Sequence, residues 1–322
     1  VETERAAGAD PLEAAAPNPE SAAVAGGEMP APVAPPPDGT PDTTWRRQWP
    51  NFRGPYGHGR AFVERVPTNW NVETGENVLW KTPSPGPGFS SPVVWRKRLF
   101  LTARSDDNRM LFCYDAADGT ELWAEDVGWR TEPLPEVDNE NMIAAGTAVT
   151  DGERVYAIFA TGELVAYTLD GEHVWQEYLG PPSIMYGYAS SPMLCDGRLL
   201  VQWDMDDGGA LVAFDPATGA ERWRTARRER SWGSPVWAPA DGKAARIFLT
   251  SINSLAAYAP DDGSLLWEVR DLLGDGDVGS SVGYGADGLL VVSSYSEGAH
   301  AFRVEDGKQS KGVLLGPRQD RK

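Results

Sequence analysis

Short apolar runs separated by Gly, Asp and Pro recur along most of the chain. In residues 90–127 these runs are SPVVW, RLFLT, MLFCYD and ELWAEDV. Runs of this length, rich in β-branched and aromatic residues and bounded by turn formers, predict strands. No stretch of the body shows the 3.6-residue period of an amphipathic helix. The pattern therefore predicts an all-β protein.

The runs form repeats, and a tryptophan closes each unit. The closing residues are Trp80, Trp123, Trp175, Trp223 and Trp267, at intervals of 43, 52, 48 and 44 residues. Upstream strands begin near Ser90, Thr147, Ser190, Gly233 and Ser280. Four strands in a repeat of about 40 to 50 residues are typical of a β-propeller blade. Because each tryptophan recurs once per blade, we expect the five to pack between blades around the ring, without converging on one site.

The acidic stretch YDAADGTELW raises the question of whether the repeats contain a metal or acid–base site. Its acids, Asp115, Asp118 and Glu121, stand at steps of three, which does not match the alternating oxygen ligands of a calcium loop. The corresponding stretches elsewhere all keep a glycine, whereas the number and positions of the acids vary. The retained residues are Gly119, Gly171, Gly219 and Gly263. A glycine at a fixed place in a hairpin indicates a positive φ, so these stretches are predicted to be turns.

The unit that ends in DPATG and Trp223 resembles the tryptophan-docking repeat of PQQ-like (quinoprotein-type) propellers of bacteria. The segments QWPNFRGPYGHGRA and YGYASSPMLCDGRLLVQ fit the same group, and the likeness runs from Trp49 to Arg303. The resemblance implies blades docked through their tryptophans, in rings that usually have seven or eight. Five to six blades are visible here, so the ring is expected to be unusually small or incomplete. Closure would follow if the strand at Trp80 completed the last blade, where Lys311 replaces the tryptophan.

The chain is predicted to have three parts. Residues 1–44 contain nine prolines and no aromatic residue, and they are expected to form a disordered acidic tail. Residues 45–76 form a lead-in segment, and residues 77–322 form the propeller. The chain starts at Val1, so the lack of a signal sequence within it does not argue against export.

Charge and hydropathy exclude two classes of function. The formal net charge is −18, whereas a nucleic-acid-binding protein needs clustered cations. No apolar run has the length of a membrane-spanning helix. The run RTARRER, residues 224–230, is expected to be a solvated loop, with contact to an acidic partner as the alternative.

The resemblance also implies what a catalytic member would need. Quinone-dependent dehydrogenases of this superfamily stack the quinone under two adjacent cysteines, hold Ca²⁺ with a Glu and an Asn, and use an Asp as base. This chain has no adjacent cysteines, since Cys113 and Cys195 are far apart and are expected to be buried. Glu140 and Asn141 are weak candidates for a Ca²⁺ site. We therefore expect no PQQ or Ca²⁺, and no catalytic residues.

Three irregular stretches between blades remain as candidate binding loops, because loops on a rigid scaffold often carry function. They are residues 128–146, 181–189 and 227–233. Their candidate contact residues are Trp129, Glu140, Asn141, Tyr186, Tyr188 and Trp232. Aromatic side chains in such loops are common binding hot spots.

The sequence thus favours a non-catalytic β-propeller scaffold of the bacterial cell envelope, periplasmic by family resemblance, that binds a protein partner. The resemblance extends to the family's outer-membrane assembly lipoprotein, although no lipobox cysteine lies near the start of this chain. The alternatives are a PQQ- and Ca²⁺-dependent alcohol or sugar dehydrogenase, and a truncated gene product without independent function. A small-molecule ligand is left open.

Overall fold

The protein was analysed as a computed structural model that describes residues 43–63, 66–106, 108–128, 143–238, 245–274, 276–285, 288–294, 297–305, 308–309 and 313–314. The chain divides into two compact units, Val1–Ala31 and Pro32–Lys322, and every described residue belongs to the second. The predicted tail at residues 1–44 lies outside the described residues except for its last two.

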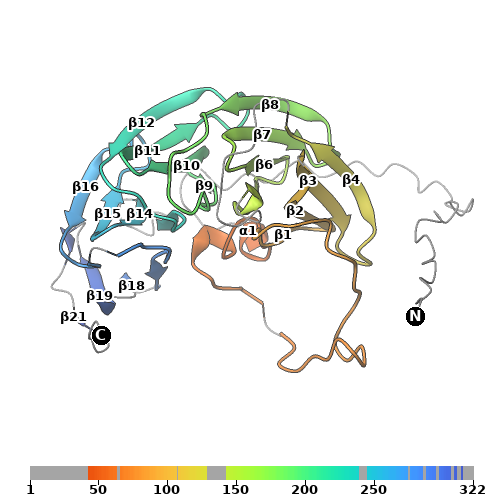
Figure 1. Cartoon of the computed structure of the whole chain (residues 1–322). Helices are drawn as coiled ribbons and strands as arrows, with labels where there is room; N and C mark the ends of the chain where they lie inside the picture. Colours follow the sequence, from red (N-terminus) through yellow and green to blue (C-terminus); the bar gives the residue numbers. More distant parts are fainter. Residues whose placement is uncertain are drawn as a thin grey trace, which may run out of the picture. The chain divides into compact units, whose positions relative to one another are not determined.

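Five antiparallel sheets make up the described part of this unit, and they follow one another around an arc (Figure 1). The first sheet contains β1 (Val93–Trp95), β2 (Arg98–Ser105), β3 (Asn108–Asp115) and β4 (Glu121–Asp126). The second contains β5 (Val149–Thr150), β6 (Arg154–Ile158), β7 (Glu163–Thr168) and β8 (His173–Tyr178). The third contains β9 (Met193–Cys195), β10 (Arg198–Met205), β11 (Gly208–Phe214) and β12 (Glu221–Arg227).

The fourth sheet contains β13 (Val236–Ala238), β14 (Arg246–Ser251), β15 (Ser254–Tyr258) and β16 (Leu265–Val269). The fifth contains β17 (Gly283–Tyr284), β18 (Leu289–Ser294) and β19 (Gly298–Glu305), and β19 also pairs with β20 (Lys308–Gln309) and β21 (Val313–Leu314). Each sheet is one blade, so the all-β propeller and its five sets of strands are confirmed. Sheets pack face to face through apolar residues, and the fourth blade presents one face to each neighbour.

Four tryptophans, each at the fourth-strand position of the repeat, bind to the blade that follows in the chain. Each indole Nε1 donates a hydrogen bond to a backbone oxygen in the turn between the third and fourth strands of that blade. The pairs are Trp80 with Ala116, Trp123 with Leu169, Trp175 with Pro216 and Trp223 with Pro260, at 2.8–3.1 Å. For Trp267, the ring packs 5.9 Å from that of Phe248, and Nε1 has no partner among the described residues. The repeat interface is therefore regular up to the fourth blade and changes at the fifth.

A chain of hydroxyl groups links the starts of the innermost strands. The backbone N–H of one residue donates to the side-chain hydroxyl of its counterpart in the following blade. The bonds run from Ser91 to Thr147, Thr147 to Ser191, Ser191 to Ser234 and Ser234 to Ser281, at 2.9–3.0 Å. The recurring serines of the sequence thus satisfy buried backbone donors between blades, which explains their spacing.

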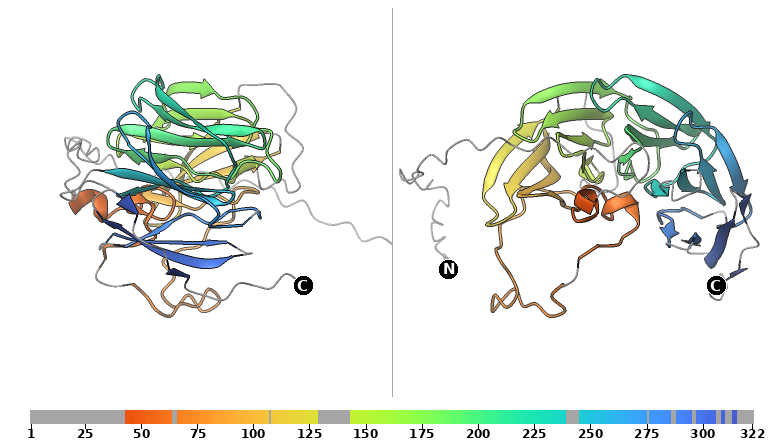
Figure 2. Two further views of the ribbon diagram at one scale, coloured as in Figure 1. Left: turned by 90° about the vertical axis from the view of Figure 1, so that its left-hand side faces the viewer. Right: turned by 180° about the vertical axis from the view of Figure 1, so that it is seen from behind.

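The lead-in does not stand apart from the propeller. Residues 45–58, called here the inner segment, include α1 (Thr43–Arg46) in part and η1 (Pro55–Gly57), and they lie on the inner side of the arc (Figure 2). Trp49 forms a β-bridge with Val94, and Thr150 donates its N–H to the Pro50 oxygen. These bonds fix the segment to the first and second blades.

The inner segment also reaches the other three blades. The Cα of Gly57 lies so close to the third and fourth blades that an added Cβ would come within 2.7 Å of Met193 and 3.1 Å of the Pro235 oxygen. His58 Nε2 donates to the Trp237 oxygen at 2.7 Å, and Arg53 donates to the Val282 oxygen at 3.2 Å. One stretch of 14 residues therefore touches the innermost strand or its approach in all five blades.

The first and fifth blades lie at the two ends of the arc (Figure 1). Trp80 docks on the first blade, but residues 78–83 belong to no described sheet. The outer edge of β19 pairs instead with β20 and β21. Closure of a five-bladed ring by the Trp80 segment, one of the two sequence-based alternatives, is not seen.

Candidate functional site

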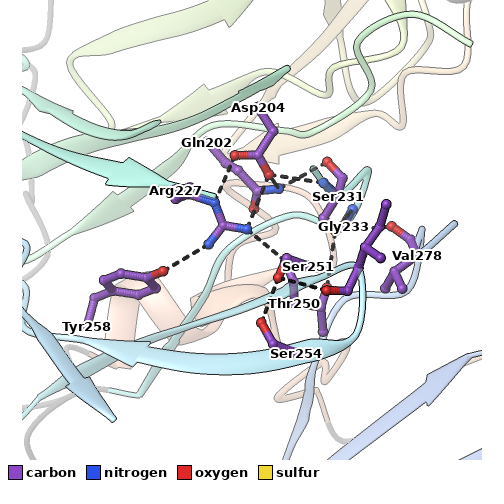
Figure 3. Close-up of polar contacts among 11 residues, drawn as sticks. Gln202, Asp204, Arg227, Ser231, Gly233, Thr250, Ser251, Ser254, Tyr258 and Val278 are labelled. Carbon is purple, nitrogen blue, oxygen red and sulfur yellow. Dashed lines mark hydrogen bonds and ion pairs between the residues drawn. The ribbon is translucent and has the colours of Figure 1, made fainter. Parts of the chain in front are cut away.

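A buried ion pair underlies the loop at 227–233 (Figure 3). Arg227, at the end of β12, donates from Nε to Asp204 Oδ1 at 2.8 Å, and both side chains are at most 3% exposed. The Asp204 carboxylate also accepts from Gln202 Nε2 at 2.8 Å and from the Ser231 N–H at 3.0 Å. Burial opposes the charge on Arg227, but Asp204 and the Tyr258 hydroxyl together outweigh that effect and hold the pKa of the guanidinium above its usual value.

The same guanidinium joins the third blade to the fourth. It donates to the Tyr258 hydroxyl at 3.1 Å and to the Thr250 oxygen at 2.9 Å. Ser231 extends the network, since its hydroxyl donates to the Val278 oxygen at 3.1 Å and accepts from the Gly233 N–H at 3.0 Å. Both residues beside Trp232 are thus held by hydrogen bonds. The expectation that residues 224–230 form a solvated loop is wrong for residues 224–227, which belong to β12, and Arg227 among them is buried.

On either side of Ser231 in the chain stand Arg230 and Trp232, which with Met185 and Tyr186 are called here the aromatic patch. The rings of Tyr186 and Trp232 are 5.8 Å apart, and the Arg230 guanidinium lies 5.4 Å from the Trp232 ring. Trp232 Nε1 donates to the Gly187 oxygen at 2.8 Å, so the two loops are joined at the patch. Met185 and Tyr186 remain 50% and 46% exposed.

Ion pairs position Arg230 at the edge of the patch. Its guanidinium lies 3.0 Å from Asp206 and 3.1 Å from Asp277, which belong to the third blade and to the approach to the fifth. Asp206 in turn donates its N–H to the Ser183 oxygen at 2.8 Å. A shallow cleft of about 370 Å³ adjoins Asp277 and is lined by Asp277, Val278, Gly279, Ser280, Ser293 and Ser294. The patch is therefore a preorganised, partly exposed surface with a cleft at its margin.

The structure brings together only some of the candidate contact residues. Tyr186 and Trp232 lie side by side. Tyr188 is 2% exposed, and its ring packs 4.6 Å from that of Trp203, so assigning it to the surface is wrong. Tyr186 and Gly187 both have positive φ, so the backbone turns between the two tyrosines, and Tyr186 stays exposed while Tyr188 is buried. Trp129, Glu140 and Asn141 lie outside the described residues.

Sequence reasoning included Arg230 in the basic run and in the loop at 227–233, but it missed Asp204 as the buried partner of this loop. Arg227 lies at the end of β12, a largely polar and exposed strand, so its burial had no clear signal in the sequence. No local pattern marks its partner, because Asp204 lies 23 positions away on another strand.

The described residues do not fit a quinone and Ca²⁺ site of the expected kind. Cys113 and Cys195 are free, buried thiols on β3 and β9, in different blades. Burial raises the pKa of Cys113 to about 11, as expected for a thiol that packs as an apolar group. Within the described ranges, no group of three or more His, Cys, Asp or Glu side chains is placed to hold a metal ion.

The acidic turns form local hydrogen bonds. Asp115 Oδ1 accepts from the Ala117 N–H at 2.8 Å, and Asp118 Oδ1 accepts from the Thr120 N–H at 2.9 Å. Both carboxylates thus stabilise the turn between β3 and β4, which contains Gly119. No helix in the described part of the chain is long and apolar enough to cross a membrane.

Solved structures with the same fold include dehydrogenases and BamB. A europium-containing methanol dehydrogenase superposes with a TM-score of 0.63 at 12% identity, over 84% of this chain and 58% of that one. BamB from Moraxella catarrhalis gives 0.50 at 18% identity, over 73% and 64%. Quinohemoprotein alcohol dehydrogenase from Comamonas testosteroni gives 0.55 at 14%, over 84% and 49%.

At these identities the likeness shows the fold alone, and the chain spans about half to two thirds of those proteins. No curated protein matches the sequence. A family model described as outer membrane protein assembly factor BamB matches residues 37–185 and 170–319, which is most of the chain. Together with the repeated four-stranded blades and their docked tryptophans, this match shows that the chain belongs to the BamB family of PQQ-like β-propeller repeat proteins.

Proposed function

We propose that the protein is a non-catalytic scaffold of the bacterial cell envelope that binds a protein partner through the aromatic patch. The observation that carries this proposal is the preorganised pair of rings, Tyr186 and Trp232, on two loops joined by the Trp232–Gly187 hydrogen bond. The solved BamB structure and the family match support an envelope location and a scaffold role, but they do not identify the partner.

Preorganisation is what makes this surface suited to binding. An exposed aromatic that must be immobilised on binding loses conformational entropy, whereas the Trp232 ring is already held by Gly187 and Arg230. Tyr, Trp and Arg are the residues most enriched among energetic hot spots of protein interfaces. The patch combines all three, and Met185 adds an adaptable apolar contact. A protein surface rich in apolar groups would complement it.

The first test uses site-specific photo-crosslinking of the full chain in envelope extracts of its source. A photoreactive residue at Met185, 50% exposed, is compared with one at Leu266 on β16, 44% exposed. We expect one protein to crosslink at position 185 and not at 266. Tyr186→Ala should weaken its binding by tenfold or more, as hot-spot truncations do, and Tyr186→Phe should retain it. Equal crosslinking at both positions would contradict the proposal.

The same chain allows a direct test of the enzymatic alternative. After addition of PQQ and Ca²⁺, we expect no dye-linked oxidation of alcohols or sugars, because the described residues lack the adjacent cysteines and a cluster of metal ligands. Oxidation that disappears in Glu140→Ala would instead favour a quinone-dependent dehydrogenase.

A further inference from the structure

Trp80 lies in a segment that has the position of a fourth strand but no blade of its own. Its indole donates to the Ala116 oxygen in the first blade, as Trp123, Trp175 and Trp223 do in the following blades. Those three tryptophans stand on β4, β8 and β12, each paired with a third strand. Residues 78–83, called here the docked segment, have no such partner.

The docked segment exposes both backbone and apolar surface. Among the described residues, the backbone groups of 79–83 form no hydrogen bond. Leu79 is 91% exposed, more than any other large apolar side chain in the described part of the chain. Unpaired backbone next to an exposed leucine is the arrangement that accepts an additional strand.

The fifth blade has the complementary defect. In the other blades, the residue opposite the tryptophan is small: Cys113, Ala166, Ala213 and Ala257 face Trp123, Trp175, Trp223 and Trp267. The corresponding residue of β19 is Ala301, and it stands opposite Val313 of the two-residue strand β21. Third and fourth strands elsewhere pair over four to six residues, but β19 and β21 pair over two.

The docked segment cannot pair with β19 of its own chain while the inner segment stays in place. The docked segment and β19 lie at opposite ends of the arc (Figure 1). The inner segment fixes the curvature between them, through Trp49 at the first blade, Pro50 at the second, His58 at the fourth and Arg53 at the fifth. Bringing the ends together would break these contacts.

We propose that the docked segment of one copy adds to the outer edge of β19 in a second copy, displaces β21, and completes its fifth blade. The register of the other blades places Trp80 opposite Ala301 and Thr82 opposite Ala299, since Trp223 and Thr225 stand opposite Ala213 and Leu211. The two surfaces differ, so the contact is head to tail. The assembly closes if the rotation between copies allows it and extends as a chain of copies if it does not.

Disulfide trapping tests this pairing with two differently tagged chains. One carries Thr82→Cys and the other Ala299→Cys, and both native thiols are buried. Residues directly opposite in an antiparallel pair are within disulfide distance. We expect mild oxidation to give a mixed dimer, whereas Lys81→Cys with Ala299→Cys should crosslink far less, because alternate side chains face opposite sides of a strand. Equal crosslinking by both pairs overturns the proposed register.

Sedimentation supplies the second measurement. The protein should form species larger than a monomer in proportions that rise with concentration. The double change Lys81→Pro with Thr82→Pro removes backbone N–H donors from both edges of the strand. Because neither N–H is bonded in the monomer, the variant should keep its far-ultraviolet spectrum and melting temperature at low concentration, and it should lose the larger species.

Three results overturn the proposal. One is a protein that stays monomeric at every concentration. Another is an undiminished assembly in the proline variant. The third is an internal disulfide in a single chain that carries both Thr82→Cys and Ala299→Cys, which would show closure within one copy.

Discussion

At the scale of single residues, glycine and tryptophan act as a pair across each blade interface. A Cβ added to Gly119, Gly171, Gly219 or Gly263 would lie 2.4–3.0 Å from the indole of Trp80, Trp123, Trp175 or Trp223. All four glycines also have positive φ. The turn therefore needs glycine for two separate reasons: the backbone conformation and the space taken by the neighbouring ring.

These two reasons can be separated by comparing two glycines with similar φ. Gly219 has φ +76° and faces Trp175, whereas Gly197 has φ +70° and has nothing within 4 Å of its added Cβ. Gly197→Ala should lower the free energy of unfolding by about 1–2 kcal/mol, the cost of the left-handed region. Gly219→Ala should cost about 1–3 kcal/mol more, because the methyl group overlaps the indole. Urea unfolding measures both.

Equal losses in the two variants would show that the Trp175 ring moves aside without cost. The hydrogen bond from Trp175 to the Pro216 oxygen, 2.8 Å long, argues against such freedom.

At the scale of elements, the inner segment is held in part by a buried histidine. His58 bonds to the Trp237 oxygen, and its ring lies 5.1 Å from that of Tyr284. Burial lowers the pKa of His58 to about 4; the bond to Trp237 partly offsets this, and the charges of Arg53 and Arg60 add to it. His58 is therefore neutral in the folded protein near neutral pH.

This shift makes stability depend on pH. Between about pH 6.5 and 4 the unfolded chain takes up a proton at His58 and the folded chain does not, so the stability present above pH 6.5 is lost as the pH falls through this range. The loss at pH 4 should reach about 3 kcal/mol. His58→Gln should remove this component of the pH dependence in denaturant titrations.

The matched control for that measurement is the exposed His173 on β8. His173→Gln makes the same substitution at an exposed site and so controls for the loss of a histidine as such. If His58→Gln and wild type lose stability in parallel between pH 6.5 and 4, the histidine is not responsible.

At the scale of the whole described unit, two kinds of contact bear on whether the blades unfold together or in parts. Blades contact their sequence neighbours through the tryptophans and the hydroxyl chain, and such nearest-neighbour arrays can unfold in parts. The inner segment contacts all five blades, for example through Tyr56, whose ring lies 5.4 Å from that of Trp237. We infer that this segment couples the blades into one cooperative unit.

Tyr56→Ala tests the coupling. Tyr56 is 5% exposed and lies in η1, which packs on β9 and β13. Its removal should lower the urea m-value and make the van't Hoff enthalpy smaller than the calorimetric enthalpy, as expected when two-state behaviour is lost. Trp70→Ala, at a residue 66% exposed, should change neither quantity. A single sharp transition in Tyr56→Ala would show that the blade interfaces alone provide the cooperativity.

The sequence by itself determined the repeat, the strand order within a blade and the role of each turn glycine. These features depend on contacts between residues less than about 50 positions apart, which recur with every blade and so reinforce one another in the pattern. Trp80 could be aligned with its counterparts for the same reason. The acids of YDAADGTELW were identified as turn formers because their counterparts vary while Gly119 is retained.

Only the tertiary structure decided what depends on contacts without a repeat. The bond from His58 to Trp237 spans 179 positions, and the one from Arg53 to Val282 spans 229. Neither contact is repeated among the described residues, so no periodic pattern in the sequence predicts it. The burial of Arg227 and Tyr188 likewise depends on which strand or loop lies opposite. Local pattern therefore determined each blade, and the unique long-range contacts of the inner segment decided how the five blades are held together.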